Sequence, residues 1–77
     1  MIDPRSMRDM REWVDFITLP LEQLGVTPHR LDDSEDWRAW AFNLTQSGAV
    51  AKFYPPDPRG FTNWVEWAER FNQVVPL

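Results

Sequence analysis

The sequence predicts an all-α fold, a small bundle of about three short helices joined by extended, proline-rich connectors. Apolar residues recur at helical spacing in three stretches of the chain. Each stretch opens at a residue type that caps helices, and six of the seven prolines fall outside them. A chain of 77 residues is the length of one domain, so we treat 1–77 as a single small domain. Such a chain buries only about 60% of its unfolded surface, which leaves room for a small core.

The first helix is expected over residues 4–17. Asp3 is placed to cap it and Pro4 suits its first position. The apolar residues on one face are Met7, Met10, Trp13, Val14 and Ile17. Pro20 is expected to interrupt the helix, so that 18–25 forms a separate short segment capped by Thr18 and ended by Gly25.

The second helix is expected from a cap at Asp32 to a stop at Gly48. Glu35 follows Asp32 at the spacing of a capping box. Its apolar face is formed by Trp37, Trp40, Ala41 and Leu44. An alternative is a β-hairpin near residues 39–54, because Trp40, Phe42 and Leu44 alternate with other residues, and that would make the fold α+β.

Residues 49–60 are expected to form an extended connector, because three of the four residues from Pro55 to Pro58 are prolines. The third helix follows over 61–75. Asn63 is its expected cap, Glu66 completes a capping box, and Pro76 ends it. Its apolar stripe consists of Phe61, Trp64, Val65, Ala68, Phe71 and Val75.

The chain has an unusual amount of aromatic mass, with five Trp, five Phe and one Tyr. Each large aromatic side chain buries about 150–250 Å² when enclosed. We expect the core to enclose most of Trp37, Trp40, Trp64, Val65, Ala68 and Phe71. A small bundle has little room for the remainder, and an exposed aromatic patch usually marks a binding site. The residues expected at a partner interface are Trp13, Phe42, Tyr54, Pro55 and Pro56.

Composition argues against several classes of function. The net charge is −4, so a basic stripe for nucleic acid is not expected. No apolar run approaches the ~20 residues that span a bilayer, and the first residues lack the apolar core of a signal peptide, which predicts a soluble protein made inside a cell. There is no cysteine and no glycine-rich phosphate loop, and a small-molecule pocket or catalytic site is not expected in so short a chain. We therefore predict no enzymatic activity, no cofactor and no metal.

Two features of the sequence are candidates for a chemical site. His29 is the one histidine, and it has no cysteine or serine partner at a recognisable spacing. An acidic cluster contains Asp32, Asp33, Glu35 and Asp36, which are explained by capping and by the positive end of a helix dipole. The same carboxylates suggest an alternative function as an acidic inhibitor, in which they occupy the site where a host enzyme binds phosphate groups.

Several segments together resemble small, largely uncharacterised proteins encoded among the structural genes of tailed bacteriophages. They are Trp13-Val-Asp-Phe-Ile-Thr-Leu-Pro-Leu, Leu31-Asp-Asp, Trp37-x-x-Trp40-Ala41, and Phe61-x-x-Trp64-x-x-Trp67-Ala68-x-Arg70-Phe71-Asn72. The resemblance implies a minor virion component of the head, connector or tail, made in the host cytoplasm, or a transient tail-assembly chaperone. The implied partner is a larger virion protein, present in several symmetric copies.

Overall fold

The computed structural model describes residues 3–32 and 36–77, and these contain four α-helices, two 3₁₀ turns and no β-strand. The elements are η1 (Pro4–Ser6), α1 (Met10–Gln23), α2 (Trp37–Thr45), α3 (Gly48–Ala51), η2 (Pro58–Gly60) and α4 (Trp64–Val74). The predicted all-α fold is confirmed. The alternative hairpin near residues 39–54 is wrong, because α2 and α3 occupy that range.

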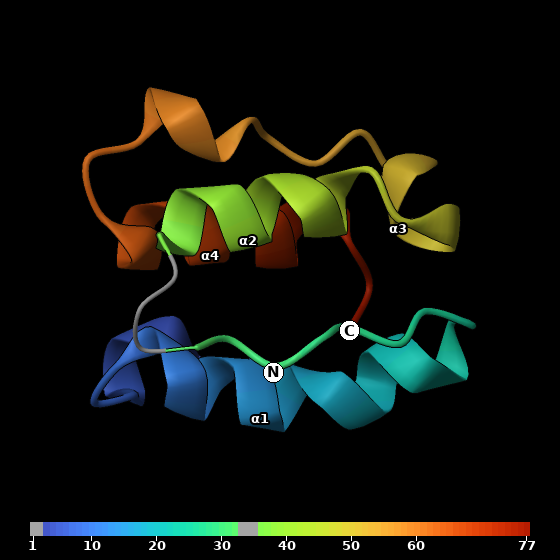
Figure 1. The fold of residues 1–77 in the computed structure, drawn as a ribbon, viewed down its shortest axis with the longest axis horizontal. Coiled ribbons are helices and arrows are strands. Elements are labelled where there is room, and N and C mark those ends of the chain that lie inside the picture. The colour runs from blue at the N-terminus through green and yellow to red at the C-terminus, as the bar shows by residue number, and fades with distance from the viewer. Residues whose placement is uncertain (1–2, 33–35) are drawn as a thin grey trace.

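The helices are stacked with α2 and α4 between two outer layers (Figure 1). On one side lies α1, and on the other side residues 52–62 cross the top of α2 as a strap that includes η2. Arg38 fastens the end of this strap, because its guanidinium donates hydrogen bonds to the carbonyl oxygens of Phe61 (2.8 and 3.2 Å) and Thr62 (3.1 Å). The start of α4 is therefore held against the start of α2.

The first long helix starts later than the sequence predicts. Asp3 and Pro4 begin only the short turn η1, where the Asp3 carboxylate accepts from the Arg5 N–H. The cap of α1 is Asp9, whose carboxylate accepts from the Glu12 N–H at 3.0 Å. The prediction of one helix over 4–17 is thus wrong at its N-terminal end.

The expected break at Pro20 is also wrong, because α1 continues through it to Gln23. Thr18 is an interior residue rather than a cap, and its hydroxyl donates to the Val14 carbonyl. Proline inside a helix costs about 3 kcal/mol. Ile17 and Leu21 are fully buried on either side of it, and each buried aliphatic side chain contributes about 1.5–3 kcal/mol, so packing outweighs the local penalty.

Gly25 is the helix stop predicted for residues 18–25, and in the structure the helix that it ends is α1. It has φ of 86°. The Gly25 N–H donates to the Glu22 carbonyl and the Val26 N–H to the Leu21 carbonyl, which is the Schellman arrangement. Leu21 and Val26 are both buried in the core, and this apolar contact commonly accompanies the motif.

The second long helix begins at a different acid from the one predicted. Asp36, rather than Asp32, caps α2 by accepting from the Arg38 N–H at 3.0 Å. Glu35, the other half of the predicted capping box, lies outside the described residues. Gly48 does not stop this helix but begins α3, so the extended connector predicted for 49–60 starts only after Ala51.

The third predicted helix is confirmed as α4. The Asn63 side chain accepts from the Glu66 N–H at 3.0 Å, as its capping pattern predicts. Ala68, Phe71 and Val75 are buried as expected, whereas Trp64 and Val65 are only half-buried. Trp67, which the predicted stripe omits, is fully buried.

The core is built around contacts between aromatic rings. Trp67 lies 5.7 Å from Trp13, 6.3 Å from Trp37 and 5.0 Å from Phe71, measured between ring centroids. Trp13 also lies 6.2 Å from Trp64. Aromatic pairs at these separations contribute about 0.5–1.5 kcal/mol each beyond the area they bury. These contacts join α1, α2 and α4.

Substitution of Gly25 tests the α1 terminus. Gly25→Ala is expected to lower the free energy of unfolding by about 1–2 kcal/mol, because a Cβ disfavours positive φ. Gly60→Ala is the matched control, since a Cβ at either position meets no atom within 4 Å and Gly60 has no positive φ. Urea unfolding should show the control within about 0.5 kcal/mol of the parent. Equal losses in both variants would contradict the assigned role of Gly25.

Candidate functional site

Three of the five predicted interface residues line one open hollow on the surface. This hollow, the Tyr54 groove, has a volume of about 350 Å³. Its walls are formed by Phe42, Thr45, Gln46, Ala51, Tyr54, Pro55 and Asp57. They come from α2, α3 and the strap, so residues far apart in sequence meet here.

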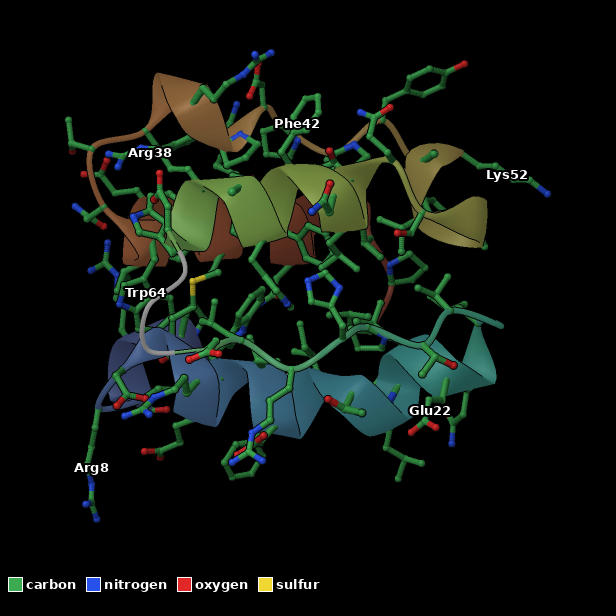
Figure 2. The ribbon with its side chains drawn as sticks, in the orientation of Figure 1. Arg8, Glu22, Arg38, Phe42, Lys52 and Trp64 are labelled. Atoms are coloured by element: carbon green, nitrogen blue, oxygen red, sulfur yellow. The ribbon has the colours of Figure 1, made fainter. Side chains whose placement is uncertain are left out.

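The floor of the Tyr54 groove is supplied by the outer face of α2. Phe42 lies two positions after the buried Trp40, and two helical positions turn the chain by about 200°. Its ring therefore faces the strap instead of the core (Figure 2). The Arg59 guanidinium carbon lies 4.7 Å from the centre of that ring, at cation–π distance. Phe42 is half-buried as a result.

Tyr54 forms the most exposed wall. Its side chain is 88% exposed, the highest value among the large exposed hydrophobic residues of the described chain. Its φ is 52°, in the left-handed region. A bulky residue in this region costs about 1–2 kcal/mol. The Tyr54 N–H donates to the Ala51 carbonyl at 3.2 Å, which closes the turn that follows α3.

The strap beyond Tyr54 is anchored in the core. The Trp67 indole donates its N–H to the Pro56 carbonyl at 2.9 Å, and Pro58 is fully buried. The predicted interface residue Pro56 is half-buried and does not line the groove. Its role in the structure is to fix the strap, while Pro55 beside it lines the groove.

Asp57, one of the residues that line the groove, forms an ion pair with Arg59. Asp57 accepts from the Arg59 backbone N–H at 2.9 Å and from the Arg59 guanidinium at 2.9–3.2 Å. The side-chain hydrogen bond from Arg59 is the main cause that lowers the pKa of Asp57, followed by the backbone hydrogen bond. In turn, the side-chain hydrogen bond to Asp57 raises the pKa of Arg59. Both groups are solvent-exposed, so the pair orients the turn more than it stabilises the fold.

The expectation that Trp13 lies at a partner surface is wrong. Trp13 is fully buried, on the same face of α1 as Met10 and Ile17, and its ring contacts those of Trp67 and Phe71. Among the indoles, Trp40 and Trp67 are also enclosed, and Trp37 and Trp64 pack half-buried against the core. The exposed large aromatic side chains are instead Phe16, Phe53 and Tyr54.

The two candidate chemical sites of the sequence, His29 and the acidic cluster, contain residues with structural roles. The His29 carbonyl accepts the Trp40 indole N–H at 2.8 Å. Asp36 caps α2 and Asp32 is exposed, while Asp33 and Glu35 lie outside the described residues. Within residues 3–32 and 36–77, no group of three or more acidic, histidine or cysteine side chains is arranged to hold a metal ion.

Comparison of the chain with protein-family profiles, with curated proteins and with solved structures finds no match in any of the three. In the described part of the chain, no helix combines the length and the apolar character that crossing a bilayer requires.

Substitution of Trp67 tests the anchoring of the strap. Trp67→Phe is expected to lower the free energy of unfolding by about 2–4 kcal/mol, because ring area is lost and the Pro56 carbonyl loses its donor. Amide exchange at Gly60 and Phe61 should quicken, since their N–H groups donate within this part of the strap. In the control Trp64→Phe, a half-buried site, the loss should be about 1 kcal/mol and exchange at these amides should be unchanged. Unchanged exchange in both variants would show that Trp67 does not hold the strap.

The ion pair makes a separate prediction about pH. The Asp57 carboxyl should titrate below its usual range, so this carboxylate stabilises the turn at neutral pH and that contribution is lost as pH falls through its lowered pKa. In Arg59→Gln, the pKa of Asp57 should rise toward the ordinary value of an aspartate. Carboxyl ¹³C chemical shifts followed against pH measure this directly. If the Asp57 titration curves of the parent and of Arg59→Gln superimposed, the ion pair with Arg59 would be excluded as the cause of the lowered pKa.

Proposed function

We propose that the protein is a non-enzymatic docking subunit that binds a larger protein through the Tyr54 groove. The observation that carries this proposal is the state of Tyr54, an aromatic side chain that is 88% exposed and has left-handed backbone geometry. Residues in strained conformations persist where the surrounding structure fixes them, and they cluster at functional sites. Tyrosine at this position presents a large ring to solvent, where asparagine or glycine suits the backbone better.

The composition of the groove supports protein binding. Phe42, Ala51 and Pro55 supply apolar surface, and Thr45, Gln46 and Asp57 supply polar groups at its margin. Exposed tyrosines are enriched at protein interfaces, because the ring buries area and the hydroxyl forms hydrogen bonds at a small loss of conformational entropy. The backbone that carries the ring is already part of a structured turn, so little ordering of the main chain is required on binding.

The proposed setting is the virion of a tailed bacteriophage. The support is the resemblance of the tryptophan-containing segments to small proteins of phage structural gene clusters. In this setting the chain is a minor component of the head, connector or tail, and it binds a larger virion protein in several symmetric copies. The small size of the fold and the aromatic side chains of the Tyr54 groove suit a subunit that decorates or joins larger proteins.

A Tyr54→Asn variant tests the role of the groove. Asparagine tolerates positive φ, so the free energy of unfolding should stay equal or rise by up to about 1 kcal/mol. The amount of the protein in purified particles of the encoding phage, measured by quantitative mass spectrometry, should fall at least about tenfold, as for loss of an aromatic hot spot. The matched control is Val74→Gln on α4, a residue 41% exposed and away from the groove, which should be incorporated normally.

Two results would contradict the proposal. Absence of the parent protein from purified particles would exclude a virion component and would leave the assembly chaperone and the acidic inhibitor as the remaining phage roles. Normal incorporation of Tyr54→Asn would exclude the groove as the docking surface.

A further inference from the structure

The outer face of α1 carries an exposed apolar pair. Phe16 is 55% and Leu19 65% exposed. They lie three positions apart and are therefore neighbours on the helix surface. The opposite face of α1 carries the fully buried Trp13, Ile17 and Leu21, so the pair points away from the core.

Three carboxylates surround this pair. Glu12 precedes Phe16 by four positions, Asp15 precedes Leu19 by four, and Glu22 follows Leu19 by three, spacings that place each acid beside an apolar neighbour. From Glu12 to the end of the helix at Gln23, α1 contains no lysine or arginine. The side chain of Glu22 extends into solvent away from the body of the protein (Figure 2).

The cations near this face gather at its N-terminal edge, where Arg8 precedes Glu12 by four positions and extends into solvent (Figure 2). Arg11 and Arg30 line, with Glu12 and Asp15, an open hollow of about 390 Å³ between α1 and residue 31. The Arg11 guanidinium lies 3.6 Å from the carboxylate of Asp9, which precedes it in the chain, whereas Leu19 follows it. The negative end of the α1 dipole lies at the Glu22 end, and it adds to the negative potential there.

We propose that this face, formed by Glu12, Asp15, Phe16, Leu19 and Glu22, binds a cationic amphipathic helix of another protein. An apolar side chain of that helix packs against Phe16 and Leu19, and its lysine or arginine side chains approach Glu12 and Glu22. A second copy of this chain is disfavoured as the occupant, because it brings the same carboxylates together. One exposed pair is far smaller than the ~800 Å² per partner of a standard interface, so binding is weak and sensitive to salt.

The α1 face and the Tyr54 groove lie on opposite sides of the molecule. In Figure 1, α1 forms one outer layer and the strap forms the other, with α2 and α4 between them. The two surfaces can therefore be occupied at the same time, and the inference from α1 does not depend on the function proposed for the groove.

The test uses the intact chain and a synthetic leucine–lysine amphipathic helix, with a leucine–glutamate twin as the reference peptide. Fluorescence anisotropy should show binding of the cationic peptide and none of its acidic twin. Raising NaCl from about 50 to about 500 mM should weaken binding by about tenfold, because charge attraction is screened. Phe16→Gln combined with Leu19→Gln should weaken it by about tenfold, as for loss of apolar anchors. Glu12→Gln combined with Glu22→Gln should weaken it and reduce its salt dependence.

The controls are Tyr54→Asn and Val74→Gln, which change exposed residues on other surfaces and should bind the peptide like the parent. Because Phe16 and Leu19 are exposed, their replacement should leave the thermal midpoint unchanged. Equal binding of the two peptides, or equal binding by the α1 variant and the parent, would overturn the proposal. Light scattering would also overturn the proposal if the parent chain were a dimer and the double variant, Phe16→Gln with Leu19→Gln, were a monomer. That result would make a second copy of the chain the occupant of this face.

Discussion

The structure depends most on the position of the Trp67 indole. Its ring contacts Trp13 of α1, Trp37 of α2 and Phe71 of α4, and its N–H donates to the Pro56 carbonyl in the strap. One side chain thus joins both outer layers to the middle of the bundle. The N–H of a buried indole usually has a hydrogen-bond partner, and the strap supplies one to Trp67 at the point where prolines leave the chain few backbone donors of its own.

This anchoring also creates the groove. With Pro56 and Pro58 held, the residues between α3 and the anchor must cross α2, and the short turn after Ala51 places Tyr54 at left-handed φ on the rim. Phe42 faces the strap because the buried Trp40 occupies the inner side of α2. The surface proposed to bind a partner is therefore a consequence of how the core is packed, rather than an addition to it.

Local signals in the sequence account for much of the fold and for part of the site. The cap at Asn63, the stop at Gly25 and the apolar faces follow from short-range rules, because hydrogen bonds and periodicity act within a few residues. The continuation of α1 through Pro20 does not follow from them, since it depends on burial of Leu21. Phe42 and Tyr54 were identifiable as surface aromatic residues, but their meeting depends on α3 and on the Trp67 anchor. The burial of Trp13 does not follow from the amount of aromatic surface, because it depends on the rings of Trp67 and Phe71 that the fold brings against it.

The enclosed rings change the physical basis for partner binding. Composition predicts that part of the aromatic surface, including Trp13, stays uncovered. The core nevertheless accommodates Trp13, whose indole nitrogen is buried with no hydrogen-bond partner in the described residues. Leaving that donor unpaired costs about 1–3 kcal/mol. Burying about 200 Å² of ring contributes about 5 kcal/mol at 25 cal/mol per Å², so the ring area decides its position. The core thus encloses the Trp13 indole even though its N–H loses a hydrogen bond. The aromatic side chains that remain exposed to solvent are Phe16, Phe53 and Tyr54. Partner binding must therefore be argued from these side chains and their surroundings, and not from tryptophan content.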